Sequence, residues 1–381
     1  MNIAWPDGMD SADFLRDYWQ KKPLLIRQAF KAFDNPLSPD ELAGLACEDG
    51  IPSRLIRELS TDNWTCEHGP FDEVTLSELP ASGWSLLVSD IEKHLPEFIR
   101  YVEPFRFIPD WRIDDLMISY APTGGSVGPH TDQYDVFLLQ ASGRREWRLG
   151  DRPLKNPELV PDLDLKILRH FTAGKISTLE PGDLLYLPPG IAHHGVSLDS
   201  RCMTWSFGFR APSLDVMVES FGRFLASQIA ADVLYRDPGL VRQTNPGEIS
   251  TQAIKDLYNM LKDTFTTDET IFSKWIGRFL TETGSTNWSN DTPRDEDWLS
   301  RLDNNNTLQR CTQSRLAYIH GDERCNLFAN GEIYSSTREM AETLCATYHY
   351  SAEKIRALAG NSLNRSLLDE LYDKDILYIE S

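Results

Sequence analysis

Between about residues 84 and 210 the chain breaks into short apolar runs separated by turns rich in glycine and proline. The runs read WSLLV, DLMISYA, YDVFLLQ, REWRL, GKISTLE, DLLYLP and MTWSFGF, and the turns include PTGGSVGP, ASGR, EPGD and PPG. Many short strands joined in this way are typical of a sandwich or barrel, not of a doubly wound parallel sheet. The segment is therefore predicted to form a jelly roll, a double-stranded β-helix.

Helical patterns flank this strand-rich segment. On its N-terminal side, Ser11 is expected to cap a helix, and Ser38-Pro39 followed by Glu41 forms a capping box with proline at the first helical position. On its C-terminal side, an amphipathic pattern begins after Ser213, and two more helical patterns follow, as far as Leu280. These later helices fit either a bundle or a dimer interface.

The C-terminal part of the chain is predicted to be a small α+β unit. RLAYIH and CNLFANGEIY indicate two strands with NG as a turn, TREMAETLCATYHY and SLLDELYD indicate helices, and ILYIE indicates a final strand. The polar segment STNWSNDTPRDED indicates a linker before it. The predicted domains are a jelly roll with N-terminal helices over residues 1–210, a helical region over 211–290, and a winged-helix-like domain over 291–381.

Charge and cysteine usage narrow the class of protein. The net charge of −20 argues against direct nucleic-acid binding, because such proteins carry a basic face, and it suits a basic protein partner. The six cysteines form no CxxC pair and indicate neither a disulfide framework nor a zinc site. With no signal peptide and no long apolar run, the protein is predicted to be cytoplasmic and not membrane-bound.

A metal site is predicted from GPHTDQYDVFLLQ. His130 and Asp132 stand two residues apart at the start of a strand-like run, so both side chains are expected on one face. Two histidines and one carboxylate form the facial triad of non-haem iron oxygenases. About 60 residues later, PPGIAHHG offers His193 and His194 as the third ligand. Adjacent residues of a strand face opposite ways, so only one of the two points inward.

The predicted co-substrate is a 2-oxo acid. Three protein ligands leave positions open on an octahedral iron for a bidentate 2-oxo acid and O₂. In SGRREWRLG, Arg145 is predicted to bind the carboxylate of 2-oxoglutarate that does not coordinate the iron, because a guanidinium binds a carboxylate bidentately. Ser119, and after it Thr204 and Ser206, are small hydroxyl residues on predicted core strands that are candidates to contact the co-substrate.

The sequence resembles the JmjC-type 2-oxoglutarate oxygenases, and among them the bacterial ribosomal oxygenases. The resemblance rests on DFLRDYWQKKPLLI, SPDELAGLA, PDWRIDDLMIS, GPHTDQYDVFLLQASGRREWR, LEPGDLLYLPPG and SFGFRAP. It implies iron ligands at His130, Asp132 and His193, a 2-oxoglutarate-binding Arg145, and a contact from Ser119. It also implies that the jelly roll of residues 1–210 is the catalytic domain, that residues 211–290 are the dimerisation region of a homodimer, and that the C-terminal domain is a winged helix. Where the family reads PPGFPHEG this chain reads PPGIAHHG, so His194 is an unusual neighbour of the ligand.

The resemblance further implies a reaction and a substrate. Fe(II), 2-oxoglutarate and O₂ would hydroxylate the β-carbon of an arginine in a basic ribosomal protein of the large subunit. Asp114, Asp115, Tyr134 and Asp135 are candidates to bind the guanidinium of that arginine, or else to serve a structural role. The alternatives are the same chemistry on another protein residue or on a nucleic-acid base, and a non-enzymatic cupin-like binding protein.

Overall fold

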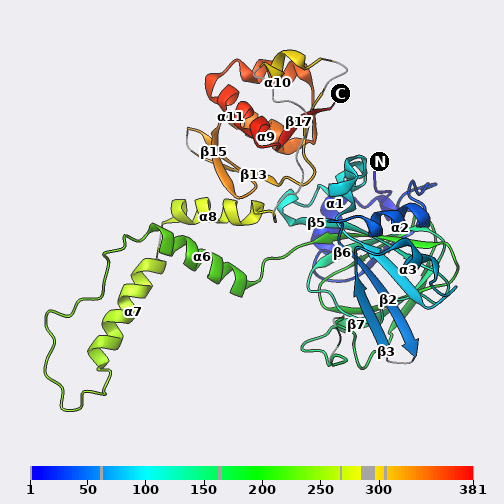
Figure 1. Cartoon of the computed structure of the whole chain (residues 1–381), viewed down its shortest axis with the longest axis horizontal. Helices are drawn as coiled ribbons and strands as arrows, with labels where there is room; N and C mark the ends of the chain where they lie inside the picture. Colours follow the sequence, from blue (N-terminus) through cyan, green and yellow to red (C-terminus); the bar gives the residue numbers. More distant parts are fainter. Residues whose placement is uncertain are drawn as a thin grey trace. The chain divides into compact units, whose positions relative to one another are not determined.

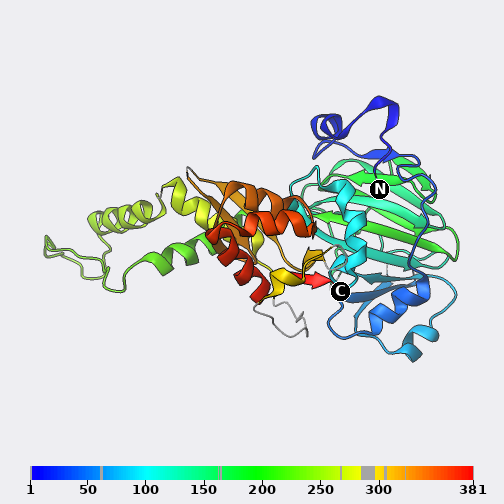
Figure 2. The same cartoon turned by 90° about the horizontal axis from the view of Figure 1, so that it is seen from above.

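The computed structural model describes residues 2–60, 63–161, 163, 165–266, 268–284, 297–303, 307–321 and 323–380. The chain divides into two compact units, Met1–Ala211 and Pro212–Ser381, and Figures 1 and 2 draw it from two directions. The boundary expected at residue 290 and most of the linker expected around it lie outside the described residues. Within those residues, no helix has the length and apolar character needed to cross a lipid bilayer.

A large antiparallel sheet forms the centre of the first unit. Its eight strands among the described residues run in the order β1-β9-β6-β11-β5-β4-β2-β3, and the cyan and green ones lie side by side in Figure 2. Their bounds are β1 (Leu24–Ile26), β2 (Ser53–Ser60), β3 (Asn63–His68), β4 (Trp84–Val88), β5 (Ile113–Ala121), β6 (Asp135–Ser142), β9 (Leu184–Leu187) and β11 (Cys202–Phe209).

A smaller sheet, in the order β10-β7-β8, completes the jelly roll. Its strands are β7 (Arg145–Pro153), β8 (Lys175–Leu179) and β10 (Ile191–Ser197). Val136 and Leu138 of β6 pack with Trp147 and Leu149 of β7 in one buried cluster, to which β8, β9 and β10 also contribute. Because side chains alternate across a strand, Phe137 of β6 faces the other way. There it contacts Phe14, with ring centroids 5.3 Å apart.

Short helices cover the outer side of the large sheet. The two longest are α1 (Ser11–Asp17) and α2 (Pro39–Cys47). The capping box of α2 is confirmed, since Glu41 N donates to Ser38 Oγ and Ser38 N donates to the Glu41 carboxylate. The cap expected at Ser11 is wrong by one residue, because Asp10 accepts from Asp13 N and Ser11 is the first helical residue.

The remaining helices of this unit connect or flank strands. They are η1 (Pro6–Gly8), α3 (Glu73–Ser77), α4 (Ile91–His94), η2 (Pro96–Phe98), α5 (Ile99–Val102), η3 (Glu103–Phe105) and η4 (Asp110–Arg112). Strands β2 and β3 were not predicted from the sequence, because SRLIRELS and NWTCEH mix charged, polar and apolar residues.

The second unit begins with α6 (Leu214–Gln228), α7 (Thr251–Phe265) and α8 (Glu269–Thr281). A long loop joins α6 to α7 (Figure 1). Trp275 of α8 packs on Phe221 of α6, with ring centroids 4.8 Å apart. The other face of α8 packs on the strands β13 and β14, where Gly277 gives Phe328 the space it needs.

Two small sheets and three helices complete this unit around one apolar core. The sheets are β16-β12-β17 and β13-β14-β15, and η5 (Trp298–Arg301) precedes them. Their bounds are β12 (Thr307–Arg310), β13 (Leu316–His320), β14 (Cys325–Ala329), β15 (Glu332–Ser336), β16 (His349–Tyr350) and β17 (Leu377–Glu380), with α9 (Arg338–Ala346), α10 (Ala352–Ala359) and α11 (Ser362–Asp373).

The Asn-Gly turn of this unit is confirmed. Asn330 and Gly331 both have positive φ, 48° and 81°, as a two-residue hairpin turn between β14 and β15 requires. The run CNLFANGEIY is therefore a hairpin of two strands and not one strand.

Candidate metal centre and active site

Three potential metal ligands meet where the two sheets of the jelly roll approach each other. His130, Asp132 and His193 each offer a ligand atom, and these atoms lie within 4.8 Å of one another. His193 belongs to β10, whereas His130 and Asp132 precede β6, so the HxD pair lies in a loop and not on the expected strand. Backbone hydrogen bonds of 3.0 and 2.9 Å between His130 and His193 hold this loop against β10.

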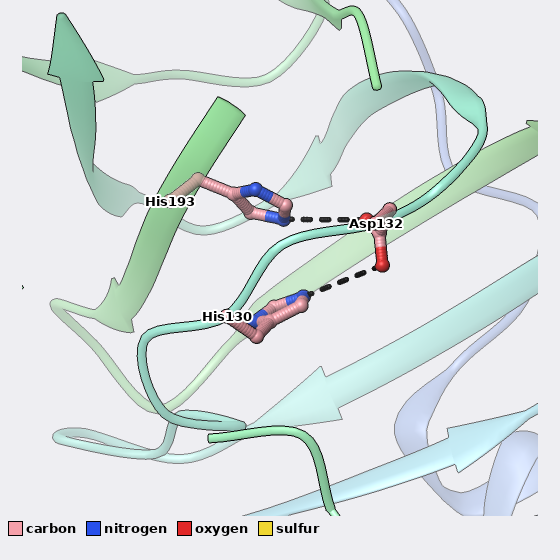
Figure 3. Close-up of side chains that lie close together, drawn as sticks. All are labelled: His130, Asp132 and His193. Atoms are coloured by element: carbon pink, nitrogen blue, oxygen red, sulfur yellow. Dashed lines mark ion pairs between the residues drawn. The ribbon is translucent and has the colours of Figure 1, made fainter. Parts of the chain in front are cut away.

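Both imidazole rings are oriented by the same local contact. Nδ1 of His130 lies 2.9 Å from the carbonyl oxygen of Gly128, and Nδ1 of His193 lies 2.9 Å from that of Ile191. A ring that donates from Nδ1 keeps the lone pair on Nε2 for a metal. The two Nε2 atoms face the Asp132 carboxylate at 4.0 and 3.5 Å, as Figure 3 shows.

The charge state of the site suits a divalent cation. Burial lowers the pKa of His193 to about 4, and the neighbouring His130 contributes. His193 is therefore neutral near pH 7 and can donate its lone pair. Two imidazole nitrogens and one carboxylate, all presented from one side, would suit ferrous iron and would leave its remaining positions open to the adjoining cavity.

His194 lies apart from this cluster. It follows His193 on β10, so it faces the opposite side of the strand, and its ring lies 6.3 Å from that of Phe171. It pairs with Arg148 across the β7–β10 ladder. Burial lowers the pKa of His194 to about 4, and the Arg148 charge adds to this effect. The geometry thus favours His193 over His194 as the third ligand.

A cavity of about 560 Å³ extends from the three ligands between the sheets. The co-substrate candidates expected from the sequence also line it, namely Arg145, Ser119, Thr204 and Ser206. Ser119 on β5 is paired with Thr204 on β11, and its Oγ donates to the Thr204 carbonyl oxygen at 3.2 Å. The side chains predicted to contact iron and 2-oxoglutarate are therefore gathered in one cavity.

Arg145 carries a buried charge with no acidic partner. Its side chain is on β7, the residue is 3% exposed, and Nη2 has no hydrogen-bond partner. No acidic side chain in the described part of the chain forms an ion pair with it. A buried, uncompensated guanidinium is unstable unless an anion joins it, so the cavity is suited to a carboxylate ligand.

Comparison with known proteins agrees with this geometry. The model of the JmjC domain matches residues 100–217, and that of the ROXA-like winged helix matches residues 260–378. Ribosomal protein uL16 3-hydroxylase from Escherichia coli is 38% identical over 282 residues, which cover 74% of this chain and 72% of that protein. The chain belongs to the JmjC-domain ribosomal oxygenases.

Solved structures support the same assignment. An X-ray structure of E. coli YcfD matches with a TM-score of 0.87 and 32% identity over all of both chains. YcfD in complex with cobalt and 2-oxoglutarate matches with a TM-score of 0.83 and 32% identity, over 100% of this chain and 99% of that one. The resemblance, the jelly-roll fold and the winged helix predicted from the sequence are thereby confirmed.

This ribosomal oxygenase has a second, acidic hollow beside the cavity. Asp90, Asp114 and Asp115 line it together with the basic side chains of Arg54 and Lys93, and Lys93 forms an ion pair with Asp90. Tyr134 and Met117 line both spaces. Burial raises the pKa of Asp115 to about 6, and the neighbouring Asp114 adds to the effect. Asp114 and Asp115, which are adjacent on β5, are suited to bind a cationic side chain here.

Asp135 does not belong to this hollow. It is fully buried and accepts hydrogen bonds from Tyr186 at 2.6 Å, Gln20 at 2.9 Å and Arg112 at 3.1 Å. The candidate role for Asp135 in binding a substrate guanidinium is therefore wrong, because a guanidinium of the chain already occupies it. Because adjacent residues of a strand face opposite ways, the sequence already indicates that Asp135 points away from Tyr134.

The apolar wall of the cavity was not foreseen. Ile56 of β2 and Leu87 of β4 line it together with Val127, Leu165 and Ile167. Strand β2 was not predicted, and the segment between β7 and β8 has no periodic pattern. The cavity therefore has an apolar wall, and the adjoining hollow carries the acidic side chains.

Proposed function

We propose that this protein is an Fe(II)- and 2-oxoglutarate-dependent hydroxylase that acts on the β-carbon of an arginine in a large-subunit ribosomal protein. One observation carries the proposal: a cluster of two histidines and an aspartate shares a cavity with a buried guanidinium that, among the described residues, has no acidic partner. Neither a hydrolase nor a structural metal site needs that combination.

In this proposal His130, Asp132 and His193 hold the iron. When bound, ferrous iron couples the decarboxylation of 2-oxoglutarate to succinate and CO₂ with insertion of one oxygen atom of O₂ into a C–H bond. The chain contributes the fixed rings, with Nδ1 of each histidine engaged by a backbone carbonyl. A structural metal site usually closes its coordination shell, whereas these ligands lie on one side.

Arg145 binds the far carboxylate of 2-oxoglutarate, with Ser119 and Thr204 beside it. The guanidinium supplies charge and a planar pair of donors, which fix the orientation of the co-substrate. A 2-oxo monocarboxylate, which lacks the far carboxylate, would leave Arg145 unpaired. The site should therefore discriminate strongly in favour of a dicarboxylate.

The acidic hollow supports arginine as the target residue. A guanidinium seated between Asp114 and Asp115 places the nearer carbons of that side chain toward the space shared with the metal cavity. The relative from E. coli is named as a 3-hydroxylase of ribosomal protein uL16. The net charge of −20 favours the approach of such a basic protein, and we place the enzyme in the cytoplasm, where ribosomes are assembled.

We also propose a homodimer formed through α6–α8. Exposed large apolar side chains are concentrated there; on α7 they are Ile254, Leu257, Tyr258, Met260, Leu261 and Phe265. No residue of α7 is buried within the described part of the chain. An amphipathic helix that exposes so many apolar side chains is expected to pack against another chain.

The test is incubation of ribosomal protein uL16 with the enzyme, Fe(II), 2-oxoglutarate and O₂, followed by intact-mass analysis and fragmentation. We expect succinate release and a gain of one oxygen on an arginine, both absent with His130→Ala. Oxygen on another residue, or turnover stimulated by RNA instead, would assign the same chemistry to a different substrate. An absence of turnover with every tested substrate would favour a cupin-like binding protein.

A further inference from the structure

A buried thiol contacts the guanidinium of Arg145 from the side away from solvent. Nε of Arg145 donates to Sγ of Cys202 at 3.4 Å, and Nε2 of Gln140 approaches the same sulfur at 3.4 Å. Cys202 and Gln140 are both 0% exposed. Arg145 is on the small sheet and Cys202 on the large one, so this contact joins the two sheets at the inner end of the cavity.

The amide of Gln140 is itself held in place. Its Nε2 also donates to the carbonyl oxygens of Ser142 at 2.8 Å and Met203 at 3.3 Å, and its Oε1 accepts from Thr204 Oγ1 at 3.2 Å. The ladder between β6 and β11 shifts register next to this point, between Met203 and Thr204. A bulge of this kind re-aims side chains, and such features often lie beside active sites.

The side chain that accepts a hydrogen bond from Arg145 Nε carries a sulfur and not a carboxylate. A carboxylate at position 202 would orient the guanidinium equally well, but it would also compensate its charge and weaken its attraction for an anionic ligand. A thiol accepts the Nε–H hydrogen bond without doing so. With Nε engaged, Nη2 is left without a partner, and a carboxylate can be bound only through the outer pair of nitrogens.

We infer that Cys202, supported by Gln140, is a positioning residue for co-substrate binding: it fixes the Arg145 guanidinium so that its outer nitrogens face the cavity. This inference rests on the proposed function, in which Arg145 binds 2-oxoglutarate. Cys202 does not touch the co-substrate, so its effect appears in the affinity for 2-oxoglutarate and not in the chemical step.

The test compares Cys202→Ala, which removes the acceptor, with Cys202→Ser, which keeps one. We expect Cys202→Ala to raise the KM for 2-oxoglutarate by about five- to tenfold, in line with the net contribution of one ordinary hydrogen bond, since sulfur is a weak acceptor. The value of kcat and the KM for the ribosomal protein should stay within about twofold of the parent. Cys202→Ser should recover most of the lost affinity.

Two controls separate the possible failures. Cys311→Ala removes a buried thiol in the other unit and should leave the KM for 2-oxoglutarate unchanged. If Arg145→Lys has no effect on that KM, the proposed co-substrate site is wrong. If Arg145→Lys raises it but Cys202→Ala does not, only the inference about Cys202 is overturned. A fall in kcat at constant KM in Cys202→Ala would indicate general damage and would also overturn it.

Discussion

At the scale of single residues, the two histidine rings of the metal site are oriented by contacts with residues close to them in the sequence. Each histidine ring of the triad points Nδ1 at the backbone carbonyl two residues before it, which is Gly128 for His130 and Ile191 for His193. The rings are thus oriented before any metal arrives. Binding then costs less side-chain entropy than it would for freely rotating ligands.

Glu92 gives a residue-scale prediction about stability and pH. It is fully buried in α4, accepts a hydrogen bond from Leu116 N at 2.9 Å, and has a pKa raised by burial to about 8. This folded-state pKa exceeds the ordinary value of 4.5. The contribution of Glu92 to the free energy of unfolding is therefore fully present below pH 4.5 and is lost as the pH rises toward 8.

Glu92→Gln keeps an acceptor for Leu116 N and removes the titration. We expect the variant to exceed the parent in free energy of unfolding at about pH 8.5 by on the order of 2 kcal/mol, and by much less at about pH 5. Urea unfolding at the two pH values measures the difference. The exposed Glu97→Gln is the control, and an equal gain from Glu92→Gln at both pH values would contradict the account.

At the scale of elements, the sequence pattern predicted most strands of the jelly roll but did not decide whether β10 forms a strand. The PPGIAHHG run has few strand-forming residues, so only pairing with β7 makes it a strand. That pairing also decides which of His193 and His194 faces the metal. Long-range pairing is not encoded in local periodicity, so neither the missed strands β2 and β3 nor the apolar cavity wall could be predicted.

The helices α6–α8 give an element-scale prediction about assembly. Leu257 and Leu261 lie on the apolar side of α7 and are 42% and 63% exposed. Replacing both with glutamate should convert a homodimer to a monomer, because buried charges oppose association. Light scattering after size exclusion measures this, and Asn259→Glu on the polar side is the matched control. A parent protein that is already monomeric would contradict the proposed interface.

At the scale of the whole molecule, the net charge is compatible with a basic partner but does not indicate where that partner docks. The net charge of −20 is a property of the sequence. The gathering of Asp90, Asp114 and Asp115 in one hollow depends on how α4 packs against β5. Distant residues meet there through the fold, so their proximity is absent from any local pattern.

The KM for the ribosomal protein and the KM for 2-oxoglutarate should therefore respond differently to ionic strength. Raising salt from about 50 to about 300 mM is expected to raise the KM for the basic ribosomal protein several-fold, because screening weakens long-range attraction. The KM for 2-oxoglutarate, measured at saturating protein substrate, should change less because Arg145 is buried. Equal changes in both constants would contradict this separation of surface and buried electrostatics.

The most direct test of the metal site is the visible spectrum of the protein with Fe(II) and 2-oxoglutarate in the absence of O₂. We expect a weak charge-transfer band that disappears in His130→Ala and in His193→Ala and that persists in His194→Ala. A band that survives His193→Ala but is lost in His194→Ala would contradict the ligand assignment. If the parent protein shows no band at all, the iron and 2-oxoglutarate site is absent.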